Sequence, residues 1–265
     1  MGLILGMQCV QDDSLARDPE RVVRIAELVT DPRWLYRFKL ITTVWQSGQP
    51  PAPRFVGVIP AAKLRASALA ALSSPSVASA MFSISKKESL DHAHFDVDLC
   101  RTQSDNIAVR SSASVRIPAD ADADAVAGEW VELQHAIVET LGAIHGVIVT
   151  ATNDDVLNAE VWLSLTTING RVMHPHPDEI RSYGARKWLL GHTYVRRPRW
   201  GTYLKPAHVA AVGGRERILE VVQPEVTRDV GDLFYIQLTA KVTEATSDTA
   251  KRRYRAFAEL LAPIT

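Results

Sequence analysis

The chain has 265 residues and is poor in cysteine, in net charge and in long apolar runs. Its two cysteines, Cys9 and Cys100, lie in strand-like apolar sequence, where reduced buried thiols are common, and the chain is long enough not to need a disulfide. No run approaches the roughly 18 apolar residues of a membrane-spanning helix. The 30 basic residues balance 30 acidic ones, whereas a dedicated nucleic-acid-binding protein is usually basic. We therefore expect a globular protein without a membrane span and without direct binding to nucleic acid.

Targeting signals and common catalytic motifs are also missing. The apolar residues 1–10 have no basic segment and no signal-peptidase site, so they predict an opening β-strand rather than a signal peptide. The sequence contains no P-loop, no G-x-G-x-x-G and no G-x-S-x-G. The expected compartment is the cytoplasm, and we expect neither an enzymatic activity nor a cofactor.

The balanced net charge is a sum over unlike thirds of the chain. Residues 1–87 hold 11 basic and 6 acidic side chains, and residues 180–265 hold 15 basic and 8 acidic ones. Residues 88–179, here called the acidic third, hold 4 arginines against 16 carboxylates. Such an excess within a globular composition indicates an acidic surface rather than a disordered acidic tail.

Helical and strand patterns mix along the chain without regular β-α-β alternation, which favours an α+β fold with mixed, mainly antiparallel sheets and packed helices. A boundary near residue 150 would divide it into two α+β lobes, residues 1–150 and 151–265. The spacing of apolar residues predicts helices at 19–29, 60–72, 125–144, 206–212, 215–222 and 249–261. Strands are predicted at 34–45, 90–101, 106–117, 147–150 and 233–239.

Two groups of histidines are candidate metal ligands. In the predicted strand 90–101, alternation places His92, His94 and Asp96 on one face, where such a row can bind a transition metal. His174 and His176 lie beside two carboxylates in a proline-rich segment. These groups allow a metal-dependent hydrolase as an alternative function, but an exposed strand face and a surface loop are the favoured interpretations.

The segment 181–217 is basic and carries interleaved aromatic residues. It holds nine Lys and Arg side chains and one carboxylate, Glu216, together with three tyrosines and two tryptophans. This composition allows single-stranded nucleic-acid binding. Because the aromatic spacing is irregular, pairing of the arginines with the acidic third within the fold is the favoured interpretation.

Three motifs in the last third resemble a known family. They are R-W-G-T-Y-L at residues 199–204, G-G-R-E-R at 213–217 and F-Y-I-Q-L-T at 234–239. The stretch from residue 183 to residue 264 resembles immunity proteins of bacterial polymorphic toxin systems, of the family numbered fifty-two. These proteins pair with toxins of restriction-endonuclease-like fold that type VI secretion delivers. The motifs themselves have the composition of scaffold, with Trp200 and Leu204 as anchors, so no functional residue is transferred from them.

The resemblance implies a non-catalytic cytoplasmic protein that binds a cognate nuclease toxin and holds it inactive. A nuclease needs a basic cleft for phosphates, so an inhibitor with a dense acidic face can occupy that cleft by charge mimicry. We therefore expect carboxylates of the acidic third to face the toxin. The candidate toxin-binding residues are Asp96, Asp98, Asp154, Asp155, Asp178 and Glu179.

Overall fold

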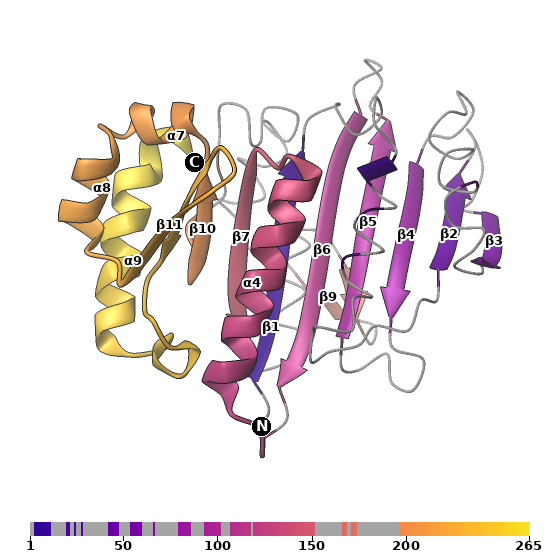
Figure 1. The fold of residues 1–265 in the computed structure, drawn as a ribbon, viewed down its shortest axis with the longest axis horizontal. Helices are drawn as coiled ribbons and strands as arrows, with labels where there is room; N and C mark the ends of the chain where they lie inside the picture. Colours follow the sequence, from indigo (N-terminus) through magenta and orange to yellow (C-terminus); the bar gives the residue numbers. More distant parts are fainter. Residues whose placement is uncertain are drawn as a thin grey trace. The chain divides into compact units, whose positions relative to one another are not determined.

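A computed structural model of the chain describes about three fifths of its length (Figure 1). The described residues are 3–11, 20–21, 24, 28, 42–47, 54–59, 66, 79–85, 93–101, 107–117, 119–151, 166–168, 171–173, 195 and 197–265. They belong to two compact units: unit 1 comprises Met1–Gln8, Arg116–Gly128 and Ile144–Thr265, and unit 2 comprises Cys9–Val115 and Glu129–Ala143. The units interleave in sequence, and the division into two lobes at residue 150 stays a prediction.

Unit 2 is built on an antiparallel sheet. Its order is β6-β5-β4-β2-β3, and every neighbouring pair of strands is antiparallel. The strands are β2 (Thr42–Ser47), β3 (Arg54–Ile59), β4 (Ser79–Ser85), β5 (Ala93–Arg101) and β6 (Ile107–Ile117), whose last two residues belong to unit 1. The predicted strands 90–101 and 106–117 are thereby confirmed as β5 and β6.

The register of unit 2 separates polar from apolar positions on β5. Asp96 pairs with Ser83 of β4 and Ser112 of β6, so these three polar positions share one face of the sheet. Phe95 lies on the opposite face, where its partners are Ile84 and Ala113. The alternation that the sequence predicts for this strand therefore continues in part across its neighbours, with Met81 opposite Asp98 and Ser111 opposite Val97 as exceptions.

In unit 1 the strands lie in the order β11-β12-β10-β7-β1, and the last three residues of β1 belong to unit 2. The central strand β10 is antiparallel to both β12 and β7, and β11 pairs with β12 at the edge. A separate hairpin joins β8 (Thr166–Ile168) to β9 (Arg171–Met173). The strands of the sheet are β1 (Leu3–Gln11), β7 (His145–Ala151), β10 (Gly201–Leu204), β11 (Val226–Val230) and β12 (Leu233–Gln237).

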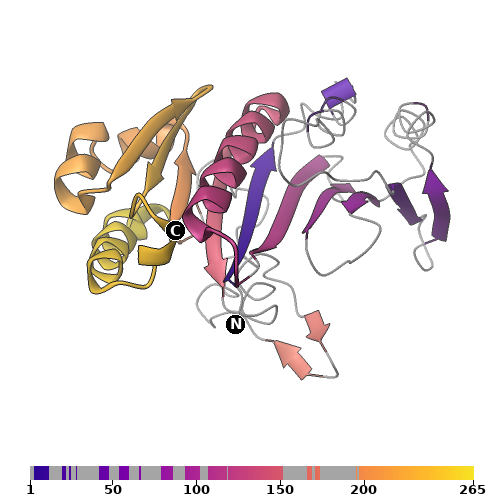
Figure 2. The same ribbon diagram turned by 60° about the horizontal axis from the view of Figure 1, so that its bottom comes forward.

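Helices of the last third gather beside this sheet. Figures 1 and 2 show α7, α8 and α9 grouped with β10, β11 and β12, and α8 packs against α9. The helices are α4 (Ala123–Leu141), α7 (Pro206–Ala211), α8 (Arg215–Val222) and α9 (Asp248–Leu261), with 3-10 turns η1 (Val242–Glu244) and η2 (Ala262–Ile264). The predicted helices at 125–144, 206–212, 215–222 and 249–261 are confirmed within a few residues at each end. The α+β fold class is therefore confirmed.

Local sequence explains where these helices begin and end. The side chain of Asp122 accepts hydrogen bonds from the backbone N–H groups of Asp124 and Ala125 at the start of α4. Ser247 caps α9 by accepting from the N–H of Ala250 at 3.1 Å. Gly213 has φ of 96°, a conformation that L side chains rarely adopt, and it separates α7 from α8. None of the helices in the described ranges is long and apolar enough to cross a membrane.

A close approach between two family-like motifs fixes the centre of the unit 1 sheet. Gly201 of β10 lies between Ile148 of β7 and Gln237 of β12 in the register. A Cβ atom at residue 201 would come within 2.8 Å of the Tyr235 hydroxyl and 3.1 Å of the Ile148 Cβ. Tyr235 is fully buried and donates to the Gln237 Oε1 at 2.7 Å, so its ring cannot move without breaking that bond. A glycine is required here by space.

We predict that Gly201→Ala destabilises the chain by about 1–3 kcal/mol, the usual cost of forcing an extra methyl group into a packed core. The matched control is Gly128→Ala in α4, where a Cβ would meet nothing within 4 Å. That change should stabilise the fold by about 0.5–1 kcal/mol, because alanine loses less backbone entropy in a helix. Urea unfolding of both variants measures the difference, and equal effects would contradict the steric account.

Candidate binding pocket

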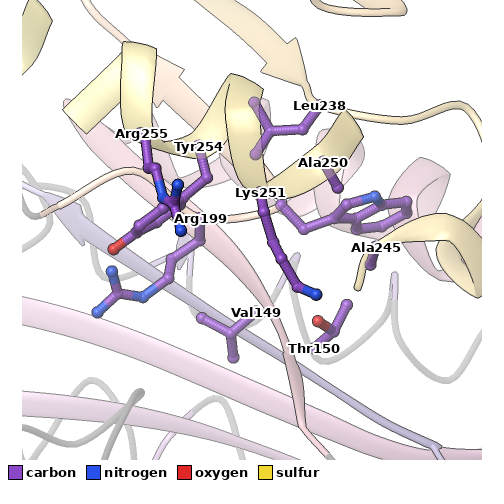
Figure 3. A pocket seen from close by; sticks show the side chains of 10 residues that line it. Val149, Thr150, Arg199, Leu238, Ala245, Ala250, Lys251, Tyr254 and Arg255 are labelled. Carbon is purple, nitrogen blue, oxygen red and sulfur yellow. The ribbon is translucent and has the colours of Figure 1, made fainter. Parts of the chain in front are cut away.

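A pocket of about 350 Å³ opens in unit 1 beside α9 (Figure 3). Its walls come from the end of β7, the approach to β10, the residues after β12 and η1, and one face of α9. This volume lies at the small end of the range typical of ligand pockets, about 300–1,000 Å³. The lining residues are Val149, Thr150, Arg199, Trp200, Leu238, Ala245, Ala250, Lys251, Tyr254 and Arg255.

Trp200 forms a rigid part of the pocket wall because its indole N–H is hydrogen-bonded within the protein. The indole Nε1–H donates to the Thr239 Oγ1 at 2.8 Å, and the Thr239 hydroxyl donates to the Lys241 carbonyl at 2.9 Å. The backbone carbonyl of Trp200 accepts from the Leu238 N–H at 2.9 Å. Only 6 % of Trp200 is exposed, so the indole N–H is satisfied within the protein.

Gln237 shapes the chain where it leaves β12. Its side-chain Nε2 donates to the carbonyls of Thr239 and Ala240, and its Oε1 accepts from the Tyr235 hydroxyl. The amide is 5 % exposed, so these bonds form largely away from water. A buried amide with three partners holds residues 238–240 in place, and Leu238 within that segment lines the pocket.

An ion pair ties α9 to the same segment. Arg253 donates to the Glu225 carboxylate and, at 2.8 Å, to the Leu238 carbonyl. Glu225 also accepts from the Ala240 N–H at 2.8 Å. The hydrogen bond from Arg253, with the one from Ala240, holds the pKa of Glu225 below its usual value. This contact therefore fixes the helix that carries four lining residues.

The charged lining residues are all cationic. Arg199, Lys251 and Arg255 are basic, and none of the ten lining residues carries a carboxylate, an imidazole or a thiol. In Figure 3 the side chains of Arg199, Tyr254 and Arg255 lie on one side of the pocket, and Lys251 lies on the other. Such a pocket can bind an anion.

The three cations differ in their ties to the protein. The Lys251 ammonium lies 3.4 Å from the Asp248 carboxylate, one turn earlier on α9, and both side chains are exposed. Arg199 is half-buried and donates from Nη1 to the Pro198 carbonyl at 3.0 Å. Arg255 is exposed and has no hydrogen bond or ion pair with any residue in the described part of the chain. Arg255 is thus the cation best able to pair with a ligand.

None of the predicted toxin-binding carboxylates is among the ten residues that line the pocket. Asp96 and Asp98 occupy alternate positions on β5, and Asp98 pairs in the register with Arg110 of β6. Four of the candidate residues lie outside the described residues, and their role stays a prediction: Asp154, Asp155, Asp178 and Glu179.

The histidine candidates for a metal site are mostly outside the described residues as well. His94 lies on β5 opposite Ser85 and Ser114, whereas His92, His174 and His176 are not described. Among the residues that the structure places, no group of three His, Cys, Asp or Glu side chains is arranged to hold a metal.

Two histidines that the sequence did not single out are buried in unit 1. The His145 Nδ1 lies 2.7 Å from the Tyr203 carbonyl, and its ring meets that of His208 edge-on at 6.1 Å between centroids. Both rings are at most 1 % exposed and occupy structural positions between β7, β10 and α7.

The basic segment 181–217 is described from residue 197 onward, apart from Val195. Arg215 donates twice to the Asp229 carboxylate, at 2.5 and 3.1 Å, and its guanidinium lies 4.6 Å from the centre of the Phe234 ring. This arginine pairs with a carboxylate of the last third rather than with one of the acidic third. Arg199 lines the pocket, which the mixed aromatic and basic composition of the segment did not predict.

Comparison with known proteins supports the fold rather than a family. No family model matches the sequence, and no curated protein matches it. A solved structure, Pseudomonas aeruginosa T6SS protein PA0821, is similar with a TM-score of 0.57 and 14 % sequence identity. The similarity covers 99 % of this chain and 73 % of that one. At this identity the likeness concerns the fold.

We predict that Thr239→Val destabilises the chain by about 1–3 kcal/mol, because the buried Trp200 indole N–H loses its acceptor while the side-chain volume is kept. Chemical unfolding measures this cost. In a Trp200→Phe background, which lacks the donor, the same change should cost clearly less. An equal cost in both backgrounds would show that Thr239 does not act through Trp200.

We predict that Glu225 contributes a pH-dependent part of the stability. Because its pKa is lowered in the folded chain, this contribution is present above the unfolded pKa and is lost as the pH falls through the folded pKa. The stability difference between the wild type and Glu225→Gln should therefore shrink from about pH 6 to about pH 3. Glu220→Gln is the control, since that exposed carboxylate on α8 has no partner in the described chain. A difference that stays constant for Glu225→Gln would contradict the assignment.

Proposed function

We propose that the chain is an immunity protein that binds a toxin of a type VI secretion system and holds it inactive. The observation that carries this proposal is the shared fold with a Pseudomonas T6SS protein over 99 % of the chain. A likeness confined to one unit would suggest only a common module. The extent of the match instead supports an association of the whole chain with such a system.

The family-like motifs support the finer part of the proposal, the immunity role. Gly201 of the first motif accommodates Tyr235 of the third, and Trp200 of the first donates to Thr239 of the third. The second motif places Gly213 and Gly214 between α7 and α8, both at positive φ. The residues that carry the resemblance thus contact one another in the fold, which fits the scaffold role that their composition predicts.

Neutralisation by occupying the active site of a nuclease requires a surface opposite in charge to that site. A nuclease cleft is basic, and the acidic third of this chain supplies the complementary charge. Asp96 shares a face of β5 with polar neighbours on both sides, which suits a hydrated surface. Carboxylates of this kind mainly accelerate association, while well-packed anchors supply the tight binding. The proposal places this complex in the cytoplasm and assigns the chain no catalytic role.

We predict that a reading frame next to this one encodes a toxin that is lethal alone and harmless when this chain is co-expressed. Survival of the co-expressing cells measures the effect. Lethality that persists at full expression of the chain would overturn the proposal. A catalytically inactive toxin should also co-purify with the chain, which separates neutralisation by binding from destruction of the toxin's product.

Charge reversal tests the acidic surface itself. Asp154→Lys with Asp155→Lys, or Asp178→Lys with Glu179→Lys, should slow association with the toxin by about tenfold at low salt. The matched control is Glu216→Lys with Glu220→Lys on the exposed side of α8, which changes the net charge equally. Stopped-flow association rates at several salt concentrations measure the effect. Rates that match the control would remove these carboxylates from the interface.

A further inference from the structure

We propose that the cationic pocket beside α9 binds an acidic side chain of the protein partner, an Asp or Glu flanked by an apolar residue. This inference rests on the proposed function, since it names the chemistry by which the toxin is held at a second point. The charged residues that line the pocket are basic, whereas the predicted acidic surface consists of carboxylates of residues 88–179.

The charged residues that line the pocket indicate an anionic group on the ligand. Arg199, Lys251 and Arg255 line one small cavity without a carboxylate among the ten lining residues. Their positive charge, which Asp248 beside Lys251 offsets in part, attracts an anion into the pocket. Arg255, which has no partner in the described chain, can form a two-point contact with a carboxylate, and the Tyr254 hydroxyl can donate a further hydrogen bond.

The remaining lining residues indicate an apolar part of the ligand. Val149, Leu238, Ala245 and Ala250 are apolar, and the Trp200 side chain adds an aromatic surface. A free inorganic anion would leave these walls uncovered by anything except water. A carboxylate carried on a short side chain, with an apolar neighbour in the same peptide, covers both kinds of surface.

The pocket is built to hold its shape before the ligand arrives. Trp200 is fixed through Thr239, and α9 is fixed by its Ser247 cap and by the pair of Arg253 with Glu225. Binding to walls that are already ordered loses less conformational entropy than binding to mobile ones. A pocket of this kind suits an anchor residue in a protein interface.

A nucleic-acid backbone fits these observations less well. Binding along a phosphate chain needs cations spread in a groove that follows the strand. Here the cations lie around one small pocket with apolar walls, Arg199 and Arg255 on one side and Lys251 on the other. Phosphate is therefore the competing ligand in the test rather than the proposed one.

The first experiment measures the affinity of the full chain for its toxin by calorimetry. We expect Arg255→Glu to weaken the complex at least about tenfold, because a desolvated charge pair becomes a repulsion. Arg255→Lys should restore much of the affinity. The matched control is Arg252→Glu, on the same helix and equally charged but outside the pocket, which should change the affinity by less than about twofold. Circular dichroism confirms that each variant is folded.

The second experiment does not need the toxin. The capped peptide Leu-Glu-Leu is titrated into the isotope-labelled chain to about 10 mM, beside Leu-Gln-Leu and sodium phosphate. We expect the Glu peptide to shift the resonances of Trp200 and Arg255, with loss of the effect in Arg255→Glu. No shift with the Glu peptide, an equal shift with the Gln peptide, or tighter binding of phosphate would each overturn the pocket proposal.

The two experiments separate failure of this inference from failure of the proposed function. If the toxin binds the wild type but Arg255→Glu and Arg252→Glu have equal effects, the immunity role stands and the pocket assignment is wrong. If the Glu peptide binds the pocket selectively while no toxin is neutralised, the proposed function is wrong and the acidic-ligand chemistry of the pocket stands.

Discussion

The contact between Tyr235 and Gly201 is the constraint on which the described part of unit 1 depends. Any side chain at residue 201 would collide with the buried phenol, so β10 and β12 can lie in this register only with glycine there. The Tyr235 hydroxyl then holds Gln237, whose amide positions the carbonyls of Thr239 and Ala240. This segment in turn holds the Trp200 indole through Thr239. It also contacts the Arg253–Glu225 pair, through the Leu238 carbonyl and the Ala240 N–H. Trp200, Leu238 and α9, which these contacts hold in place, form walls of the pocket.

The sequence predicts much of this fold because its periodic elements are long or well bounded. The helix α9 has a serine cap and a buried row that includes Ala250, Phe257 and Leu261, and proline follows it directly. The strands β5 and β6 were equally plain from alternation. In contrast, β11 was missed because three of its five residues are exposed at the sheet edge, and β10 because all four of its residues are buried and show no alternation.

The pocket could not be predicted for a different reason. Its lining residues come from separate stretches, among them Val149, Arg199, Leu238 and Arg255, and no spacing in the sequence connects them. Only the packing of α9 beside β7 and β12 brings them together. The basic composition of segment 181–217 pointed toward cations in this part of the chain. It could not show that Arg199 would join α9 residues from beyond that segment, while Arg215 would pair with Asp229.

Separation of charge gives the zero net charge its physical meaning. The account assigns two kinds of contact with the partner: carboxylates of residues 88–179 bind a basic cleft, and the cationic pocket binds an acidic side chain. The account as a whole depends on whether that partner is a toxin. The most direct measurement is a titration of the adjacent-gene toxin, assayed for nuclease activity, with the purified chain. The account predicts that activity falls to background at saturation, and full activity at a large excess of the chain would contradict it.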